Sequence, residues 1–147
     1  MTAQNVQVLL KVAAKLNVTV EVDVEFCNGR KCTGACITSP SGVVIKLVSF
    51  ENEGTLAHEL VHAFQRMTGD YLWEEEDLEF WCAINDISLD VLYVARFSKL
   101  WESEAQKNPN YFSSEKRRRE FLAYYVGWAE NGMNLFWRIA KEVLASR

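Results

Sequence analysis

The stretch Thr55-Leu56-Ala57-His58-Glu59-Leu60-Val61-His62-Ala63-Phe64 decides how the rest of the chain is interpreted. Two histidines four residues apart on a helix point to the same side, so that their imidazoles can hold one metal ion. The spacing matches the HExxH pattern, in which both histidines bind zinc and the intervening glutamate acts as a general base towards water. The apolar residues around this polar trio predict that it is buried.

The histidine content makes the pattern specific. The chain has two histidines, and both belong to this stretch. The alternative is a surface helix that carries the three polar residues by coincidence. A buried glutamate and two buried imidazoles need partners, however, and a metal ion supplies them. We therefore expect zinc on His58 and His62, with Glu59 as the catalytic base.

Length and composition limit the classes to which the protein can belong. The 147 residues fit one domain, 1–147, which is large enough to bury a core without disulfides. Hydrophobic residues at 49% and charged residues at 24% exclude a disordered chain. The net charge of −4 gives no general attraction to nucleic acid or anionic membrane, and the basic run at residues 116–119 is interpreted as a solvated helix face. Without a signal peptide or an apolar membrane span, the predicted location is cytoplasmic.

The N-terminal part shows alternating helical and strand patterns. Residues 4–17 have apolar positions at helical spacing, and residues 18–26 alternate between apolar and polar as in a half-buried strand. Residues 37–39 and 43–48 predict a hairpin, with its turn at Pro40-Ser41-Gly42, that leads into the metal helix. The last strand is a candidate sheet edge for an extended peptide; an interior strand without a ligand role is the open alternative.

Three of the four cysteines lie in residues 27–36, where two glycines and a basic pair predict a loop or an irregular hairpin. Cys27, Cys32 and Cys36 are one ligand short of a structural zinc site, and Cys82 is the other thiol. Their spacing departs from the CxxC pairs typical of such sites. The sequence therefore favours a reduced or redox-labile cluster over a second, structural zinc ion.

Two long helices are predicted after the metal helix. The first extends from about residue 72 to residue 100, and Asn108-Pro109-Asn110 breaks the pattern. The second extends from about residue 115 to residue 145, and Gly127 or Asn131-Gly132 can kink or split it. The whole order predicts an α+β fold: an N-terminal helix, a small mixed sheet with hairpins, the HExxH helix and two long C-terminal helices.

The third metal ligand must be a carboxylate or a thiol, because a catalytic zinc usually has three protein ligands and the chain has no third histidine. Two helices joined by a short turn around Asp70 run antiparallel, so residues whose numbers sum to about 140 lie at the same height. This geometry selects Glu79, with Glu76 as the first alternative. Asp86, two turns further on, is a candidate to orient a ligand imidazole.

This ligand set resembles that of the zincin metallopeptidases in their glutamate-ligated form, the gluzincins, and the residues that carry the resemblance are His58, Glu59, His62 and Glu79. The resemblance implies a zincin-like fold and a zinc-dependent peptidase that acts on a peptide or protein substrate, with Glu59 as general base. The alternative is a metal-binding regulator or interaction module without proteolysis. Glu59 favours the enzyme, because a binding module has no use for a general base there.

A narrower likeness covers roughly residues 24–90. Over this range the sequence is similar to the pattern of the mitochondrial metallopeptidases that process an ATP-synthase subunit. In that family a histidine stands where this chain has Glu79. The residues that carry the likeness are Cys27, Cys32, Cys36, the stretch 55–64, Trp73 and Cys82.

Overall fold

The chain divides into two compact units, Met1–Gly69 and Asp70–Arg147. The prediction of an α+β protein is confirmed, because helices accompany one small three-stranded sheet. The assignment of residues 1–147 to a single domain stays a prediction. The structure is a computed structural model and describes residues 3–51, 53–68, 75–88, 95–96, 99, 102–103, 106–107, 120, 122–127 and 132–145.

The first unit is built on a sheet with strand order β1-β3-β2. Strand β1 (Val18–Val22) is parallel to β3 (Gly42–Leu47), and β2 (Gly34–Ser39) is antiparallel to β3. Ser39 pairs with Gly42 across the turn, so the predicted hairpin is confirmed. The suggestion that its last strand is a sheet edge is wrong, because β3 has a neighbour on each side and the edges are β1 and β2.

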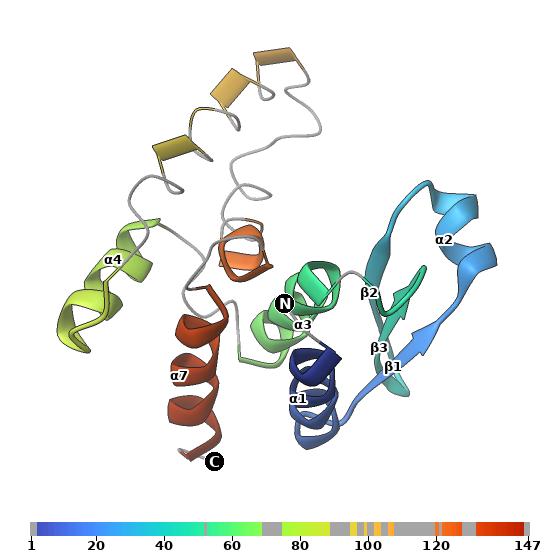
Figure 1. Cartoon of the computed structure of the whole chain (residues 1–147), viewed down its shortest axis with the longest axis horizontal. Helices are drawn as coiled ribbons and strands as arrows, with labels where there is room; N and C mark the ends of the chain where they lie inside the picture. The colour runs from blue at the N-terminus through green and yellow to red at the C-terminus, as the bar shows by residue number, and fades with distance from the viewer. Residues whose placement is uncertain are drawn as a thin grey trace. The chain divides into compact units, whose positions relative to one another are not determined.

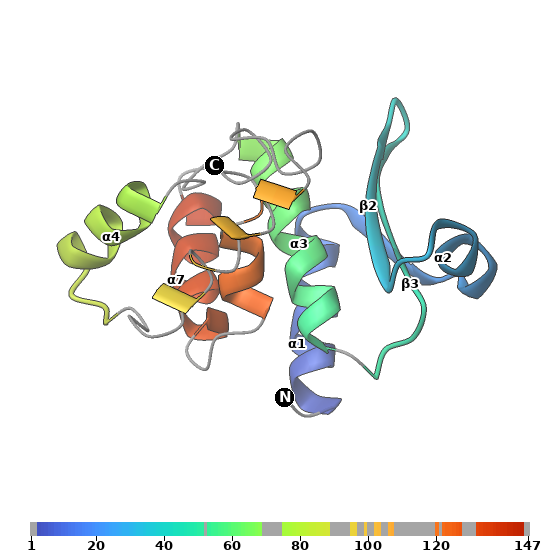
Figure 2. The same cartoon turned by 90° about the horizontal axis from the view of Figure 1, so that it is seen from above.

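Helices α1 (Ala3–Lys15) and α3 (Glu53–Thr68) lie side by side on one face of this sheet (Figures 1 and 2). The predicted N-terminal helix is thereby confirmed, and its buried positions recur at helical spacing as expected. Between the helices and the sheet, Ile45 and Leu47 of the central strand are fully buried. The core members from α1 and β3 are Val6, Leu9, Val12, Ala13, Leu16, Ile45 and Leu47.

Helix α2 (Val24–Arg30) replaces the end of the predicted strand and the start of the predicted loop. The alternating pattern of residues 18–26 continues past Val22, but Asp23 is a helix N-cap whose side chain accepts a hydrogen bond from Phe26 N–H at 3.1 Å. Lys46 holds the same carboxylate at 2.8 Å. The cap therefore starts a helix where apolar alternation alone predicts a strand.

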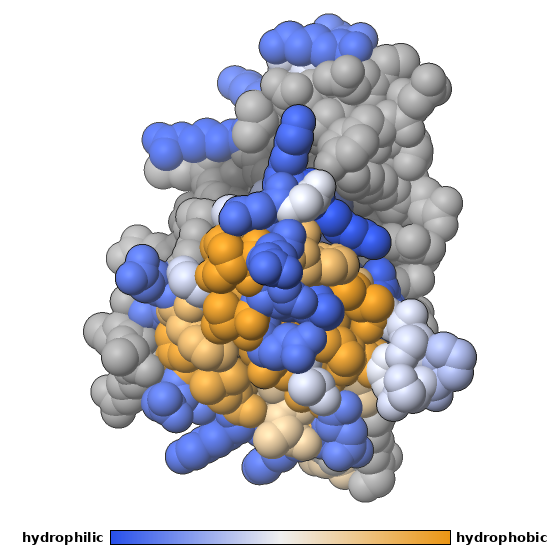
Figure 3. Space-filling view, turned by 90° about the vertical axis from the view of Figure 1, so that its right-hand side faces the viewer, coloured by the Kyte–Doolittle hydropathy of each residue, from blue (hydrophilic) through white to orange (hydrophobic). Residues whose placement is uncertain are grey.

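Helix α2 lies on the face of the sheet opposite α1 and α3 (Figures 1 and 2). It covers that face only in part, so that Ile37 and Val44 remain half-buried. Val22 and Val24 are 45% and 47% exposed at the junction of β1 with α2. The face therefore presents apolar side chains around charged ones (Figure 3).

In the second unit, α4 (Glu75–Ile84) is shorter than predicted. Asp86 adopts the left-handed conformation with φ of 55°, and Ile87 N–H bonds to Cys82 C=O at 2.8 Å. This bond and the 3.4 Å bond from Asp86 N–H to Ala83 C=O form a Schellman motif, which ends the helix. The prediction of one continuous helix from about residue 72 to residue 100 is therefore wrong, because α4 ends at Ile84.

Helix α7 (Gly132–Ala145) begins at the glycine where the sequence allowed the last helix to split. Residues 122–127 are also helical, and a Cβ on Gly132 would stand 2.3 Å from Tyr125 C=O and 2.8 Å from the Val126 Cα atom. Only glycine permits this close approach. The prediction of a helix over residues 115–145 thus holds for 122–127 and for α7.

Some predictions fall on residues outside the described ranges, namely the break at residues 108–110 and the basic run at 116–119. Within the described residues, no helix combines the length and the apolar character that crossing a membrane requires. The cytoplasmic location stays a prediction.

The Asp23–Lys46 pair predicts a pH-dependent contribution to stability. The hydrogen bond from Lys46, followed by that from Phe26 N–H, lowers the pKa of Asp23 below its ordinary value of 3.8. A lowered pKa stabilises the fold above pH 3.8, and this contribution is lost as the pH falls through the folded pKa. Asp23→Asn keeps a capping side chain but removes the charge, so we expect a lower melting temperature than wild type at pH 7.

Thermal unfolding between pH 2 and pH 7 checks this expectation, and the difference between wild type and Asp23→Asn should shrink below pH 3.8. Glu21→Gln is the matched control, because Glu21 contacts the same lysine at 3.4 Å and its side chain is 48% exposed. It should change the melting temperature less. An equal effect of both variants at every pH would contradict the assignment.

Candidate metal centre

Helix α3 carries His58, Glu59 and His62 as the sequence predicted. The apolar residues of the helix are buried in the protein and fix its orientation. Glu59 is buried with 8% exposure, whereas the two histidines are half-buried. Burial of the whole trio was therefore predicted correctly for Glu59 only. The apolar α3 residues that anchor the helix are Leu56, Ala57, Leu60, Val61, Ala63 and Phe64.

The two imidazoles converge on one point. Their Nε2 atoms are 3.2 Å apart, and the ring centroids are separated by 4.8 Å with an interplanar angle of 75°. A tetrahedral zinc ion with two nitrogen ligands at about 2.05 Å holds them about 3.3 Å apart. The separation of the two nitrogens therefore fits two corners of a zinc site, without a change of helix geometry.

Gln65 sets the orientation of one of these rings. Its Oε1 atom lies 3.2 Å from Nδ1 of His62, and its side chain is 1% exposed. A carboxamide oxygen can only accept, so Nδ1 of His62 donates and Nε2 carries the lone pair that a metal requires. Sequence reasoning missed Gln65, although its position three residues after His62 places it on the same side of α3.

Glu59 lies against the start of the edge strand β2. A Cβ on Gly34 would stand 3.4 Å from Glu59 Cγ, 2.6 Å from Thr55 Cγ2 and 3.1 Å from Leu47 Cδ2. The absence of a side chain at Gly34 thus lets α3 approach the sheet at the position of the carboxylate. This close approach buries the stem of Glu59 against the backbone of β2.

Arg66, two turns beyond Glu59, ties the same helix to the same strand. Its Nη1 atom donates to Cys36 C=O at 3.0 Å and to the Thr38 hydroxyl. Thr33 C=O accepts from Val48 N–H at 3.0 Å, and successive residues of a strand alternate, so Cys36 directs its backbone away from β3. Arg66 therefore binds the outer edge of β2 and fixes its distance from α3.

The thiols of Cys27 and Cys36 lie close enough to Glu59 for its charge to raise their pKa values. Burial raises the pKa of the Cys36 thiol to about 11, with Arg66 opposing and Glu59 adding to the shift. Burial also raises the pKa of Cys27, and Cys32, Asp23 and Glu59 raise it further. Within the described residues, the three clustered cysteines do not form a group that could hold a metal ion. A structural zinc ion on them is therefore not supported.

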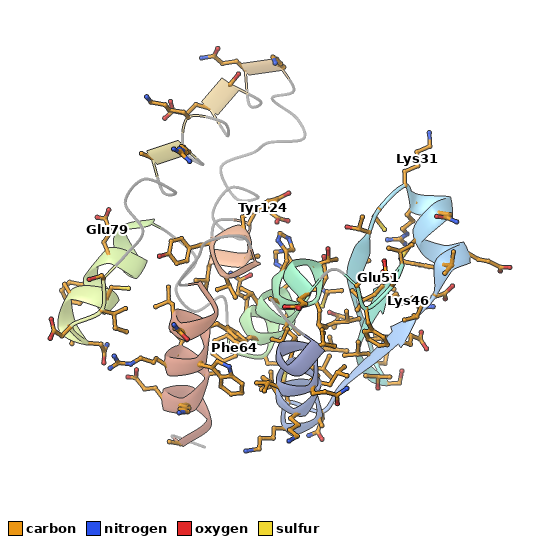
Figure 4. All side chains as sticks on the ribbon, viewed as in Figure 1. Lys31, Lys46, Glu51, Phe64, Glu79 and Tyr124 are labelled. Carbon is orange, nitrogen blue, oxygen red and sulfur yellow. The ribbon has the colours of Figure 1, made fainter. Side chains whose placement is uncertain are left out.

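The predicted third ligand, Glu79, belongs to the second unit. It lies on α4, and its side chain is exposed (Figure 4). The alternative ligand Glu76 is also on α4, but its side chain lies outside the described part. Asp86 ends α4 in the left-handed conformation. The described geometry brings together His58, Glu59 and His62, and the roles assigned to Glu79 and Asp86 stay predictions.

Comparison with known proteins gives no relative. No protein-family model, no curated protein and no solved structure matches this chain.

The contact at Gly34 predicts a selective effect of adding one methyl group. Gly34→Ala places a carbon within 3 Å of the Thr55 side chain, so we expect a loss of about 1–3 kcal/mol of stability from overpacking. Chemical denaturation measures this loss. Gly29→Ala is the matched control: it lies inside α2 with nothing within 4 Å of the added carbon and should be neutral or stabilising. Equal stability of the two variants would show that α3 does not pack tightly against β2 at Gly34.

Proposed function

We propose that the protein is a zinc-dependent peptidase whose metal is held by His58 and His62. The observation that supports this most strongly is the 3.2 Å separation of the two Nε2 atoms on α3, with Glu59 buried on the same turn. Both rings offer nitrogen, the donor that zinc prefers together with thiolate and carboxylate. The site therefore has two metal ligands and a separate acid–base group.

Each residue has a distinct role in the proposed reaction. Zinc, when bound, supplies Lewis acidity and makes water more acidic. Gln65 keeps the proton of His62 on Nδ1 and leaves Nε2 for the metal. The Glu59 carboxylate takes a proton from the attacking water and delivers it to the leaving amine of the cleaved peptide. Gly34 lets the backbone of β2 support this carboxylate from one side.

Two carboxylates are candidates for the third ligand. Glu79 is the residue that the helix-pair argument selects from the sequence. Glu76, on the same helix α4, is the first alternative. The height argument favours Glu79, which pairs with the level of the two histidines, whereas Glu76 lies nearer the turn. We therefore propose Glu79 ahead of Glu76.

Metal affinity separates the two candidates. Glu79→Gln should weaken zinc binding by about 10-fold or more, whereas Glu76→Gln should leave it within about 2-fold of wild type. A competition titration with a chromophoric chelator measures both. The two substitutions are chemically identical and serve as mutual controls. Weaker binding in Glu76→Gln alone would show that the helix-pair argument selects the wrong carboxylate.

Substitution of Glu59 tests the peptidase proposal. Glu59→Gln keeps the shape of the side chain but removes the base, so peptide cleavage should fall by about 10²–10⁴-fold while zinc remains bound at one equivalent. Mass-spectrometric screening of a peptide library measures the cleavage, and elemental analysis measures the metal. His58→Ala should lose both.

The control for this experiment is Gln7→Glu, a change on the exposed side of α1. It should retain cleavage and zinc. If wild type binds zinc but cleaves no peptide in the library, or if Glu59→Gln cleaves as well as wild type, the peptidase proposal fails and the metal serves a binding module.

A further inference from the structure

The C-terminus of α2 brings two cysteines together by its backbone alone. Lys31 is left-handed, with φ of 55° and ψ of 45°, and its N–H bonds to Asn28 C=O at 3.2 Å. Cys32 N–H bonds to Cys27 C=O at 3.0 Å. These two bonds form a Schellman motif, which is frequently accompanied by a contact between the side chains at the positions that Cys27 and Cys32 occupy.

The backbone distance suits a disulfide. From Cys27 Cα to its oxygen is about 2.4 Å, and from Cys32 N to its Cα is about 1.5 Å, so with the 3.0 Å hydrogen bond the two Cα atoms cannot be more than about 6.9 Å apart. Disulfides span Cα distances of about 4.4–6.8 Å. Both residues carry free thiols, and Cys32 raises the pKa of Cys27, as expected of thiols in contact.

The third cysteine of the cluster has a different environment. Cys36 lies in β2, where Arg66 Nη1 contacts its Sγ at 3.7 Å and its carbonyl oxygen at 3.0 Å. These contacts hold Cys36 between β2 and α3, on the inward face of the sheet. Spacing in the sequence does not show which two of the three thiols can pair. The backbone at the end of α2 brings Cys27 and Cys32 together.

We propose that Cys27 and Cys32 are a redox-active dithiol that closes reversibly to a disulfide, while Cys36 remains a thiol. The oxidant is a small disulfide such as oxidised glutathione. The half-buried Cys32 attacks one sulfur of the reagent and releases the first thiol; Cys27, fully buried, then loses its proton, attacks Cys32 Sγ and releases the second thiol. Two protein thiols become one disulfide, and the reagent is reduced to two thiols.

The position of this pair in the chain links it to Glu59, the proposed general base. Thr33 and Gly34 follow Cys32 directly, and Gly34 is the residue that packs against Glu59. A bridge between Cys27 and Cys32 fixes the chain immediately before this contact. The chemistry of the dithiol itself requires neither zinc nor peptidase activity, so its test is independent of the proposed function.

Tryptic mapping of the full-length protein tests the proposal. After treatment with oxidised glutathione, remaining thiols are alkylated and the chain is digested; trypsin cuts after Arg30 and Lys31, which separates Cys27 from Cys32. Wild type should yield residues 16–30 linked to residues 32–46, and dithiothreitol should reverse the link. Cys36 lies in the same second peptide, so the variants must distinguish the partners.

Cys36→Ser and Cys32→Ser form the matched pair. The linked peptide should persist in Cys36→Ser and fall by about 10-fold or more in Cys32→Ser. Both positions are half-buried, so comparable folding is expected and circular dichroism verifies it. A link that survives in Cys32→Ser and disappears in Cys36→Ser would overturn the pairing. Wild type that gives only glutathione adducts, or that does not react, would overturn the proposal of a dithiol.

Discussion

Helix α3 must satisfy two demands at once, and the rest of the first unit depends on how it does so. Its apolar residues are buried, with Leu60 and Phe64 fully removed from solvent. The same helix directs two imidazoles towards a common point, with their Nε2 atoms 3.2 Å apart. Because residues four apart lie one turn apart on the same side, one regular helix meets both demands. The fixed rotation of α3, set by burial, is what positions the imidazoles.

The sheet supports Glu59, the proposed general base, from one side. The central strand β3 has a neighbour on each side and supplies the buried Ile45 and Leu47. The edge strand β2 meets α3 at Gly34, and Arg66 joins the two elements further along. Helix α3 is therefore held against β2 at two points along its length. This explains why Glu59 is buried while the histidines next to it stay accessible.

Sequence patterns predicted the elements that depend on apolar periodicity. Helix α1, the hairpin of β2 and β3, and α3 with its polar trio all follow from spacing and turn residues. The errors occur where a single polar residue or backbone conformation overrides the pattern. Asp23 starts α2 inside a predicted strand, and left-handed Asp86 ends α4 inside a predicted helix. A single capping residue or left-handed residue carries little weight in a prediction from apolar periodicity, but it decides where a helix or strand begins or ends.

The candidate site was predictable to the extent that it lies on one helix. HExxH specifies its own geometry, because all of its residues share α3. Gln65 and Gly34 escaped notice because their roles depend on a rotamer and on the approach of two elements that are distant in sequence. The third ligand stays a prediction, because the height argument depends on the turn around Asp70, which lies outside the described residues.

Nitrogen-15 NMR of the imidazole rings during a zinc titration tests the central claim most directly. If His58 and His62 form one site, a single equivalent of zinc should shift the Nε2 resonances of both rings together, and Nδ1 of His62 should remain protonated through its bond to Gln65. A titration in which only one ring responds, or in which neither does, would show that the two imidazoles do not share an ion.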